Sequence, residues 1–160
     1  MEKILSTEYT IRFSDCDPFG HLNNARYIDY FLNAREDHLK KYYDFELVRY
    51  AHLALSWVVN SHEIIYVRPA AYNEQVVIRS SLLKATSSSV HVEMIMMNAG
   101  TTQVKALMWT KFTIVNLKTG KKANHPEEFM EFADPLQMEE DLFLNGINER
   151  IKVLKREFPG

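Results

Sequence analysis

The residue types best suited to chemistry are concentrated in residues 14–27, which read Ser-Asp-Cys-Asp-Pro-Phe-Gly-His-Leu-Asn-Asn-Ala-Arg-Tyr. This stretch holds two carboxylates, an imidazole and two carboxamides. A carboxylate can act as a general base or as a nucleophile. Unpaired N–H groups at the start of a helix can hold the negative charge that develops on a carbonyl oxygen. An acid followed by a glycine turn and a helix therefore supplies both parts of a site that attacks a carbonyl group.

Asp17 and His21 are the first candidates for this chemistry. As a catalytic group, Asp17 would activate water or attack the carbonyl carbon; as a structural group, it would close an Asx turn, since Asp-Pro often opens a turn. His21 is a candidate to orient water, to donate to the carbonyl oxygen or to steady Asp17, and the alternative is a turn histidine without a catalytic role. We expect Asp15 to hold the turn together and Cys16 to be a small packed side chain.

Asn23 and Asn24 stand just before the expected helix. Asparagine is among the best N-capping residues, so we expect one of the two to cap the helix. The other would offer its carboxamide or backbone N–H to the substrate carbonyl or to a catalytic water. The sequence does not separate these roles; we count Asn24 among the catalytic candidates and Asn23 among the substrate contacts.

Periodicity predicts the elements that position these residues. Residues 7–14 place Tyr9, Ile11 and Phe13 at a period of two, which is typical of a half-buried strand. After the turn, apolar residues recur from Tyr27 at spacings of three and four, which predicts a helix of about four turns.

The rest of the chain predicts four more strands and C-terminal helices. The strand-like runs are residues 55–67, 74–84, 89–98 and 103–116. Long consecutive strands with short turns indicate an antiparallel meander. A proline at position 126 followed by acids predicts a short helix to about residue 133, and residues 136–158 are amphipathic with an interruption at Asn145-Gly146.

This order of elements predicts an α+β fold in which one antiparallel five-stranded sheet covers one long central helix. We expect a single domain over residues 1–160, with its core at about 7–116 and a helical extension at about 126–158. Such a sheet leaves its edges exposed, so a homodimer or homotetramer in which a second copy continues the sheet is expected.

Composition limits the classes of function. The chain has 160 residues and a formal net charge of −2, and its 19 basic residues are scattered, which argues against nucleic acid as a partner. A single cysteine excludes an internal disulfide and fits a reducing compartment. We expect a cytoplasmic protein without a membrane segment, since no apolar run approaches the ~20 residues of a span. The histidines are not spaced as a metal set, so no metal is expected.

Residues 15–27, together with Tyr30-Phe31 and Ala34-Arg35, resemble the acyl-CoA thioesterases of the hotdog fold, in the branch similar to 4-hydroxybenzoyl-CoA and acyl-ACP thioesterases. The resemblance continues in Ile65-Tyr66-Val67-Arg68-Pro69, which is similar to a strand of that family that ends in Tyr-x-Arg-Pro. It covers about residues 7–116 and leaves the C-terminal extension unexplained.

The resemblance implies a hotdog fold and an enzyme that hydrolyses an acyl-CoA or acyl-ACP thioester to a free acid and a thiol. It implies that Asp17 is the catalytic carboxylate and that His21, four positions later, assists. No cofactor is implied, since coenzyme A enters as part of the substrate. Candidate substrate contacts are Asn23, Tyr27, Arg68 and Lys84. The alternative is a non-catalytic hotdog protein that binds acyl thioesters or serves in assembly, because Phe19 replaces an asparagine of the plant acyl-ACP enzymes.

Overall fold

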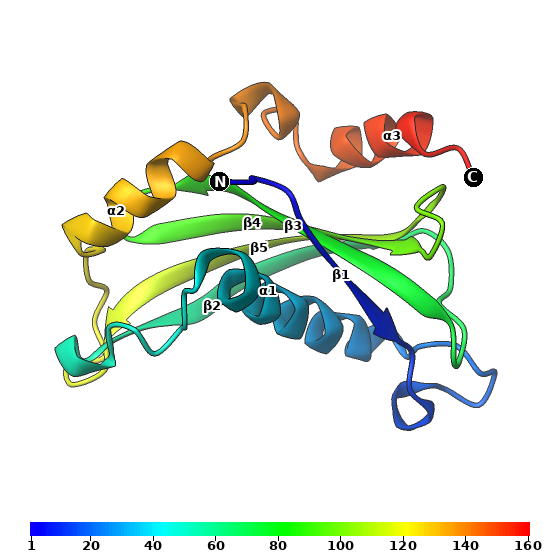
Figure 1. Cartoon of the computed structure of the whole chain (residues 1–160), viewed down its shortest axis with the longest axis horizontal. Helices are drawn as coiled ribbons and strands as arrows, with labels where there is room; N and C mark the ends of the chain where they lie inside the picture. The colour runs from blue at the N-terminus through cyan, green and yellow to red at the C-terminus, as the bar shows by residue number, and fades with distance from the viewer.

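One long helix lies against the inner face of a curved five-stranded antiparallel sheet (Figure 1). The computed structural model describes residues 1–160. The strands are β1 (Leu5–Thr10), β2 (Leu55–Tyr66), β3 (Gln75–Ala85), β4 (Ser89–Asn98) and β5 (Val104–Asn116). The helices are α1 (Tyr27–Tyr43), α2 (Glu127–Ala133) and α3 (Ile147–Glu157). This arrangement confirms the expected fold class, including the C-terminal helices.

The order of the strands differs from a simple meander. The sheet runs β1-β3-β4-β5-β2, so β3, β4 and β5 form a meander while β2 pairs with β5 at one edge. The prediction that all four later strands follow one another in space was therefore wrong. After Tyr66, the segment 67–74 carries the chain to the opposite side of the sheet, where β3 pairs with β1. Period-two patterns identify strands but not their neighbours.

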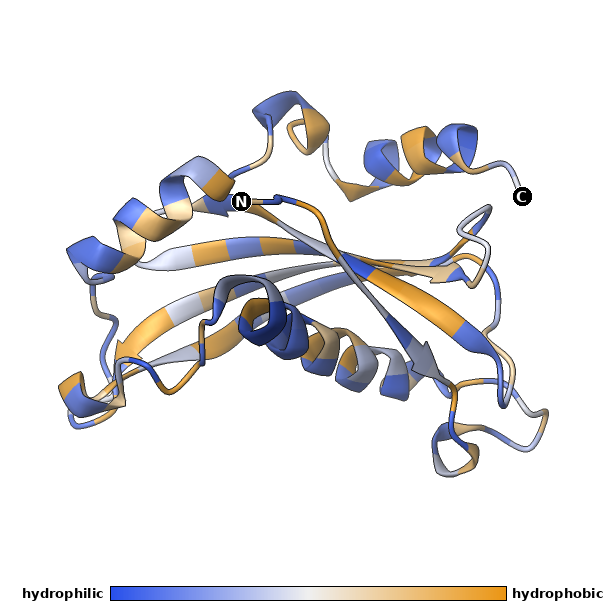
Figure 2. Ribbon diagram, viewed as in Figure 1, coloured by the Kyte–Doolittle hydropathy of each residue, from blue (hydrophilic) through white to orange (hydrophobic).

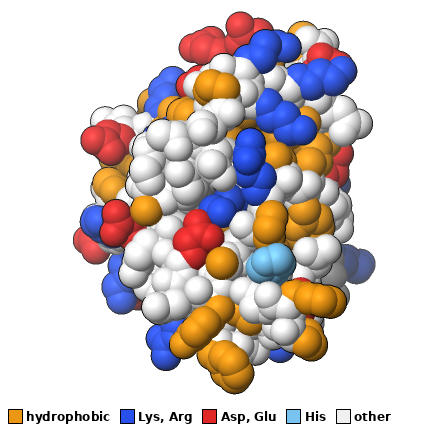
Figure 3. Space-filling view, turned by 90° about the vertical axis from the view of Figure 1, so that its right-hand side faces the viewer, with side chains coloured by type: hydrophobic (Ala, Val, Ile, Leu, Met, Phe, Trp, Pro, Cys, Tyr) orange, Lys and Arg blue, Asp and Glu red, His pale blue; other side chains and the backbone are white.

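The first strand is also shorter than its pattern predicts. β1 ends at Thr10, and a 3₁₀ turn at Phe13–Asp15 follows. The Arg12 N–H donates to the Tyr30 hydroxyl of α1 (3.0 Å) instead of to a strand. Phe13 is consequently 77% exposed. Figure 3 views the end of the molecule where this turn lies and shows hydrophobic side chains gathered on its lower part.

The two faces of the sheet carry separate cores. On the inner face, α1 buries a stripe of side chains against β1, β3 and β4, consisting of Tyr27, Phe31, Ala34, Arg35 and His38. On the outer face, Ile95 and Met97 of β4 pack with Ile151 and Leu154 of α3. Figure 2 shows hydrophobic and hydrophilic residues alternating along α3, as expected for a helix that covers one face.

α3 is also fixed to the outer face by a buried ion pair. The Arg150 guanidinium donates from Nη2 and Nε to the two oxygens of Glu93 (2.8 and 2.9 Å), and the Trp109 indole donates to the same carboxylate (2.9 Å). The Glu93 side chain is only 3% exposed. Bidentate pairing with a third donor is the geometry in which a buried carboxylate is well compensated.

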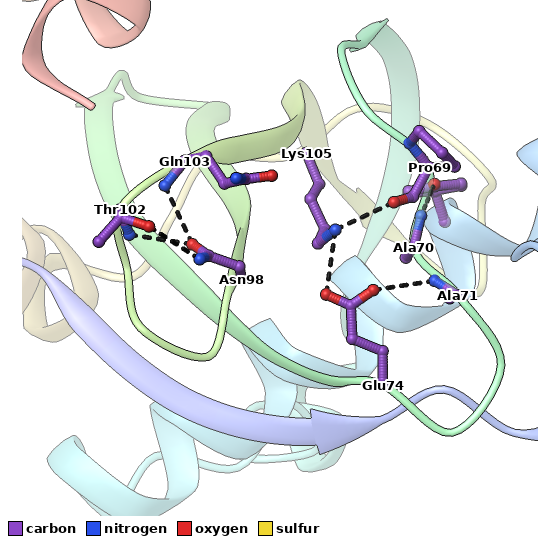
Figure 4. Close-up of polar contacts among 9 residues, drawn as sticks. Pro69, Ala70, Ala71, Glu74, Asn98, Thr102, Gln103 and Lys105 are labelled. Carbon is purple, nitrogen blue, oxygen red and sulfur yellow. Dashed lines mark hydrogen bonds and ion pairs between the residues drawn. The ribbon is translucent and has the colours of Figure 1, made fainter. Parts of the chain in front are cut away.

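A second buried ion pair holds the loop that follows β2 (Figure 4). The Lys105 ammonium group of β5 contacts Glu74 Oε2 (3.0 Å) and donates to the Pro69 carbonyl (3.0 Å). The other Glu74 oxygen accepts the Ala71 N–H (2.9 Å). The side chains of Lys105 and Glu74 are 7% and 27% exposed, so water screens the pair weakly. The pair therefore ties residues 69–74 to the sheet.

Replacing Lys105 with methionine should destabilise the fold, because Glu74 would lose its ionic partner and the Pro69 carbonyl would lose a donor. Removing one partner of a buried pair typically costs about 3 kcal/mol or more. The free energy of unfolding from urea titration measures this effect. Lys111→Met is the matched control on the same strand, since Lys111 forms no ion pair, and it should change stability by less than about 0.5 kcal/mol. Equal losses in the two variants would contradict the role of the pair.

His38 should make stability depend on pH. Its ring is fully buried between the hydroxyls of Thr7 (2.8 Å) and Ser80 (2.6 Å), and burial lowers its pKa from 6.5 to about 4. Between these values the unfolded chain binds a proton at His38 and the folded chain does not, so the free energy of unfolding falls as the pH falls from 6.5 towards 4. Denaturant titrations across this range should show a smaller fall in His38→Gln. The control is His52→Gln, at an exposed histidine; a slope reduced equally in both variants would refute the assignment.

Candidate active site

Asp17 closes the turn that precedes α1 and still keeps one oxygen free. Its Oδ1 accepts the N–H groups of Phe19 (2.9 Å) and His21 (3.2 Å), while its backbone N–H donates to the His21 carbonyl (2.8 Å). Gly20 takes the left-handed conformation that this turn requires (φ +78°). No protein group donates to Oδ2. Asp17 therefore forms the Asx turn that the sequence analysis gave as its structural role. The turn uses only Oδ1, so Oδ2 is held in position without a hydrogen bond to the protein.

The loop of residues 69–74, which Lys105 holds, forms hydrogen bonds with this turn. The Leu22 N–H donates to the Ala70 carbonyl (2.8 Å), and the Tyr72 N–H donates to the Gly20 carbonyl (2.8 Å). His21 and Ala71 form an isolated β-bridge. The position of the Asp17 carboxylate therefore depends on the loop that the Lys105–Glu74 pair fixes to the sheet.

His21 lies in the same turn, but its imidazole makes no hydrogen bond within the protein. The residue is exposed, and only its backbone contacts Asp17. The structure thus places the two candidates side by side along the chain without a bond between their side chains.

The two asparagines have different surroundings. Asn23 Oδ1 accepts the Ala25 N–H (2.9 Å), so Asn23 caps the 3₁₀ turn Asn24–Arg26 that leads into α1. Asn24 is exposed, its carboxamide has no protein partner, and its backbone carbonyl accepts the Tyr66 hydroxyl (2.7 Å). The capping role belongs to Asn23, which leaves the Asn24 carboxamide available beside the turn.

Asp15 and Cys16 are tied into the scaffold. Asp15 Oδ2 accepts the Tyr30 hydroxyl (2.6 Å), and the Cys16 thiol donates to the Arg12 carbonyl (3.3 Å). Burial, together with the nearby charges of Asp17 and Asp15, raises the pKa of the Cys16 thiol. A thiol with a raised pKa is a poor nucleophile at neutral pH.

The three remaining candidates for substrate contact are dispersed. Tyr27 is only 2% exposed, and its hydroxyl accepts the Ala70 N–H (3.2 Å). Arg68 is exposed and forms no ion pair. Lys84 is exposed ten positions beyond Glu74, which corresponds to ~33 Å along β3 and puts it at the far end of the sheet from Asp17. Within one chain, the structure does not bring Lys84 to the turn.

An apolar pocket of about 270 Å³ lies on the inner face of the sheet, between α1 from Leu32 onward, the start of β2 and α2. Its walls include Leu39 and Tyr43 of α1, Trp57 of β2, and Phe129 and Phe132 of α2. Sequence reasoning missed this pocket. The spacing of Phe129, Phe132 and Ala133 in α2 could have predicted that this helix has an apolar face directed inward.

The pocket extends along α1 from Leu32 to Tyr43, whereas the turn precedes the start of the helix. Twelve positions separate Tyr27 from Leu39, which corresponds to ~18 Å along the helix. Within one chain, the part of the pocket around Leu39 therefore lies away from the turn that carries Asp17.

No cluster of three or more histidine, cysteine, aspartate or glutamate side chains is arranged to hold a metal ion. The helices are all too short or too polar to cross a membrane.

Known proteins share this arrangement. The chain is 29% identical over 117 residues to the long-chain acyl-CoA thioesterase FadM of Escherichia coli (strain K12), a match that covers 73% of this chain and 87% of FadM. The solved structure of YbaW, a probable thioesterase from Escherichia coli, is 25% identical with a TM-score of 0.72, covering 84% of this chain and 99% of YbaW.

A DHNA-CoA thioesterase from Staphylococcus aureus has the same fold, with a TM-score of 0.74 at 16% identity over 96% of this chain and 94% of that one. The model of the thioesterase-like superfamily matches residues 11–133, from the end of β1 to the end of α2. This range contains the turn, the long helix and the entire later sheet, so the chain belongs to the thioesterase-like superfamily, with the hotdog fold.

Proposed function

We propose that this protein hydrolyses an acyl-CoA or acyl-ACP thioester with Asp17 as the reactive carboxylate. The observation that carries the proposal is that only one of the two oxygens of Asp17 is hydrogen-bonded within the protein. Because Oδ1 is held by two backbone N–H groups, Oδ2 is fixed in direction without a protein donor. A carboxylate fixed in this way at the start of a helix is suited to general-base or nucleophilic attack on a carbonyl group.

The reaction divides between this carboxylate and the start of α1. Asp17 takes a proton from water, or attacks the carbonyl carbon to give a mixed anhydride that water then cleaves. N–H groups at the start of α1 would hold the charge on the carbonyl oxygen, and the Asn24 carboxamide and His21 imidazole would contact the oxygen or the water. The thiol leaves as coenzyme A or the carrier protein, so no separate cofactor is required. The expected cytoplasmic location stays a prediction.

We further propose that the working unit is a homodimer joined through β2. This strand forms the sheet edge, and its side chains Val58 and Val59 are 43% and 44% exposed. An unpaired, apolar edge favours pairing with a second strand. Antiparallel pairing of β2 with its own copy would place the C-terminal end of one strand beside the N-terminal end of the other.

This pairing would join the two halves of the site. Tyr66, at the C-terminal end of β2, is bonded to Asn24 beside the reactive turn, whereas Ser56 and Trp57, at the other end, line the apolar pocket. Each pocket would then lie beside the turn of the other copy. The acyl group would occupy the pocket of one subunit while Asp17 of the other acts on the thioester.

Asp17→Asn should lower turnover by about 10²- to 10⁴-fold, since the amide oxygen can keep the two turn hydrogen bonds while the charge is lost. Thiol release from a panel of acyl-CoA and acyl-ACP thioesters measures this. Asp15→Asn is the matched control in the same turn and should stay within a few-fold of the unaltered protein. Unchanged turnover in Asp17→Asn would remove Asp17 from the mechanism. Saturable acyl-CoA binding by the unaltered chain without any thiol release would favour the non-catalytic alternative. That alternative was raised because Phe19, which is 85% exposed, replaces an asparagine of the plant acyl-ACP enzymes.

Asn60→Pro should separate the subunits and lower turnover together. Asn60 lies at the bulge of β2 and has no partner in the register with β5, so proline there should spare the sheet but obstruct a second strand. Sedimentation and thiol release at matched concentrations test the link, with Asn60→Ala as the control that keeps the dimer. A fully active monomer would contradict the shared site.

A further inference from the structure

Arg35 is a buried cation without an acidic partner. It lies on the inner face of α1, is 9% exposed and lines the apolar pocket. Its only hydrogen bond is from Nη1 to the Ser80 hydroxyl (2.9 Å), and it forms no ion pair. The buried Lys105 and Glu93 side chains of the sheet both have ionic partners. Arg35 is thus the exception among them.

The groups around Arg35 do not neutralise it. Burial lowers the pKa of Arg35 to about 10, which leaves the guanidinium charged at neutral pH. His38 shares the Ser80 hydroxyl and is uncharged at neutral pH, because burial lowers its pKa to about 4. Tyr43, the other titratable neighbour, donates its hydroxyl to the Glu2 carbonyl. Glu36 also lines the pocket, but it is exposed and forms no ion pair or hydrogen bond with the guanidinium.

The free donors of Arg35 face open space. No buried side-chain nitrogen or oxygen of the protein lacks a hydrogen-bond partner. Since Nε and Nη2 of Arg35 make no such bond, these atoms are not sealed in the core but are accessible, and the space that Arg35 borders is the pocket. The pocket is otherwise largely hydrophobic, with 15 of its 19 lining residues apolar.

The size of the pocket limits what it can hold. At roughly 30 Å³ for each non-hydrogen atom, 270 Å³ accommodates about nine such atoms. That is the size of a medium-length acyl chain. A purely hydrocarbon chain would fill the apolar walls but would cover the guanidinium without giving it a partner, and a buried charge left unpaired is strongly unfavourable.

We propose that the pocket takes an acyl group whose far end carries a carboxylate, so that the methylenes contact the apolar walls and the carboxylate pairs with Arg35. The substrate class is then the monothioester of a medium-length dicarboxylic acid. This inference rests on the proposed function for the hydrolytic step, but the binding part does not. A guanidinium with free donors matches a carboxylate in both charge and fork geometry.

The kinetic test compares octanedioyl-CoA with octanoyl-CoA, which differ in the terminal carboxylate. The unaltered protein should prefer octanedioyl-CoA in kcat/KM by about tenfold or more, as expected for a hydrogen bond to a charged group. Arg35→Met, which keeps the apolar stem, should reverse this preference, and Arg35→Lys should keep part of it. Arg79→Met is the matched control, because Arg79 lies over Phe158 and does not line this pocket. A preference for octanoyl-CoA in the unaltered protein would overturn the inference.

A binding test separates this inference from the proposed function. Trp57 lines the pocket, so its fluorescence should report binding of free octanedioate and octanoate to the unaltered protein and to Arg35→Met. Octanedioate should bind the unaltered protein about tenfold or more tightly than octanoate, with the difference lost in Arg35→Met. Selective binding without thiol release from any thioester would refute the proposed hydrolytic function but not the role of Arg35. Thiol release without selective binding would refute the role of Arg35 alone. Circular dichroism and thermal unfolding establish that each variant is folded.

Discussion

The ion pair between Lys105 and Glu74 is the constraint on which the Asp17 turn depends. Lys105 lies on a central strand of the sheet, while Glu74 and the Pro69 carbonyl belong to the loop that crosses to β3. That loop supplies the Ala70 carbonyl and the Tyr72 N–H that hold the turn at Leu22 and Gly20. A rigid β strand thus fixes a loop, and the loop fixes the turn. Functional groups carried on loops need such support, because a displacement of about 1 Å can cost a hundredfold in rate.

The turn itself shows that a structural role and a chemical role need not compete for one residue. For Asp17, the Asx turn and the reactive carboxylate were opposed interpretations of the sequence. The structure assigns the turn to Oδ1 and leaves Oδ2 without a protein donor. An asparagine would form the same turn, so the turn alone does not explain an aspartate at this position. The turn requires the accepting oxygen of Asp17 but not its negative charge.

Local patterns in the sequence predicted most of the elements, and long-range contacts account for what they missed. The strand expected at residues 89–98 and the end of the C-terminal short helix agree with the structure, because alternation and a proline start are local signals. The Arg35–Ser80 contact joins residues 45 positions apart, and no periodicity encodes such a pairing. The structure places Arg35 and His38, two polar residues, on the otherwise apolar buried face of α1, a conflict that often marks function. The apolar pocket also needs α2, which lay outside the family resemblance, so the sequence alone could not assemble it.

The two faces of the sheet and its edge strand β2 together limit how copies of this chain associate. The outer face is covered from within the chain, since α3 packs on Ile95 and Met97 and is fixed by the Arg150–Glu93 pair. The inner face is covered by α1 and α2. β2 remains as a long strand with exposed valines and an unpaired backbone edge. The dimer proposed above would use this edge and leave the two covered faces unchanged. The same pairing would bring the turn of one copy beside the Trp57 end of the pocket of the other, so the proposed assembly and the proposed chemistry depend on the same strand.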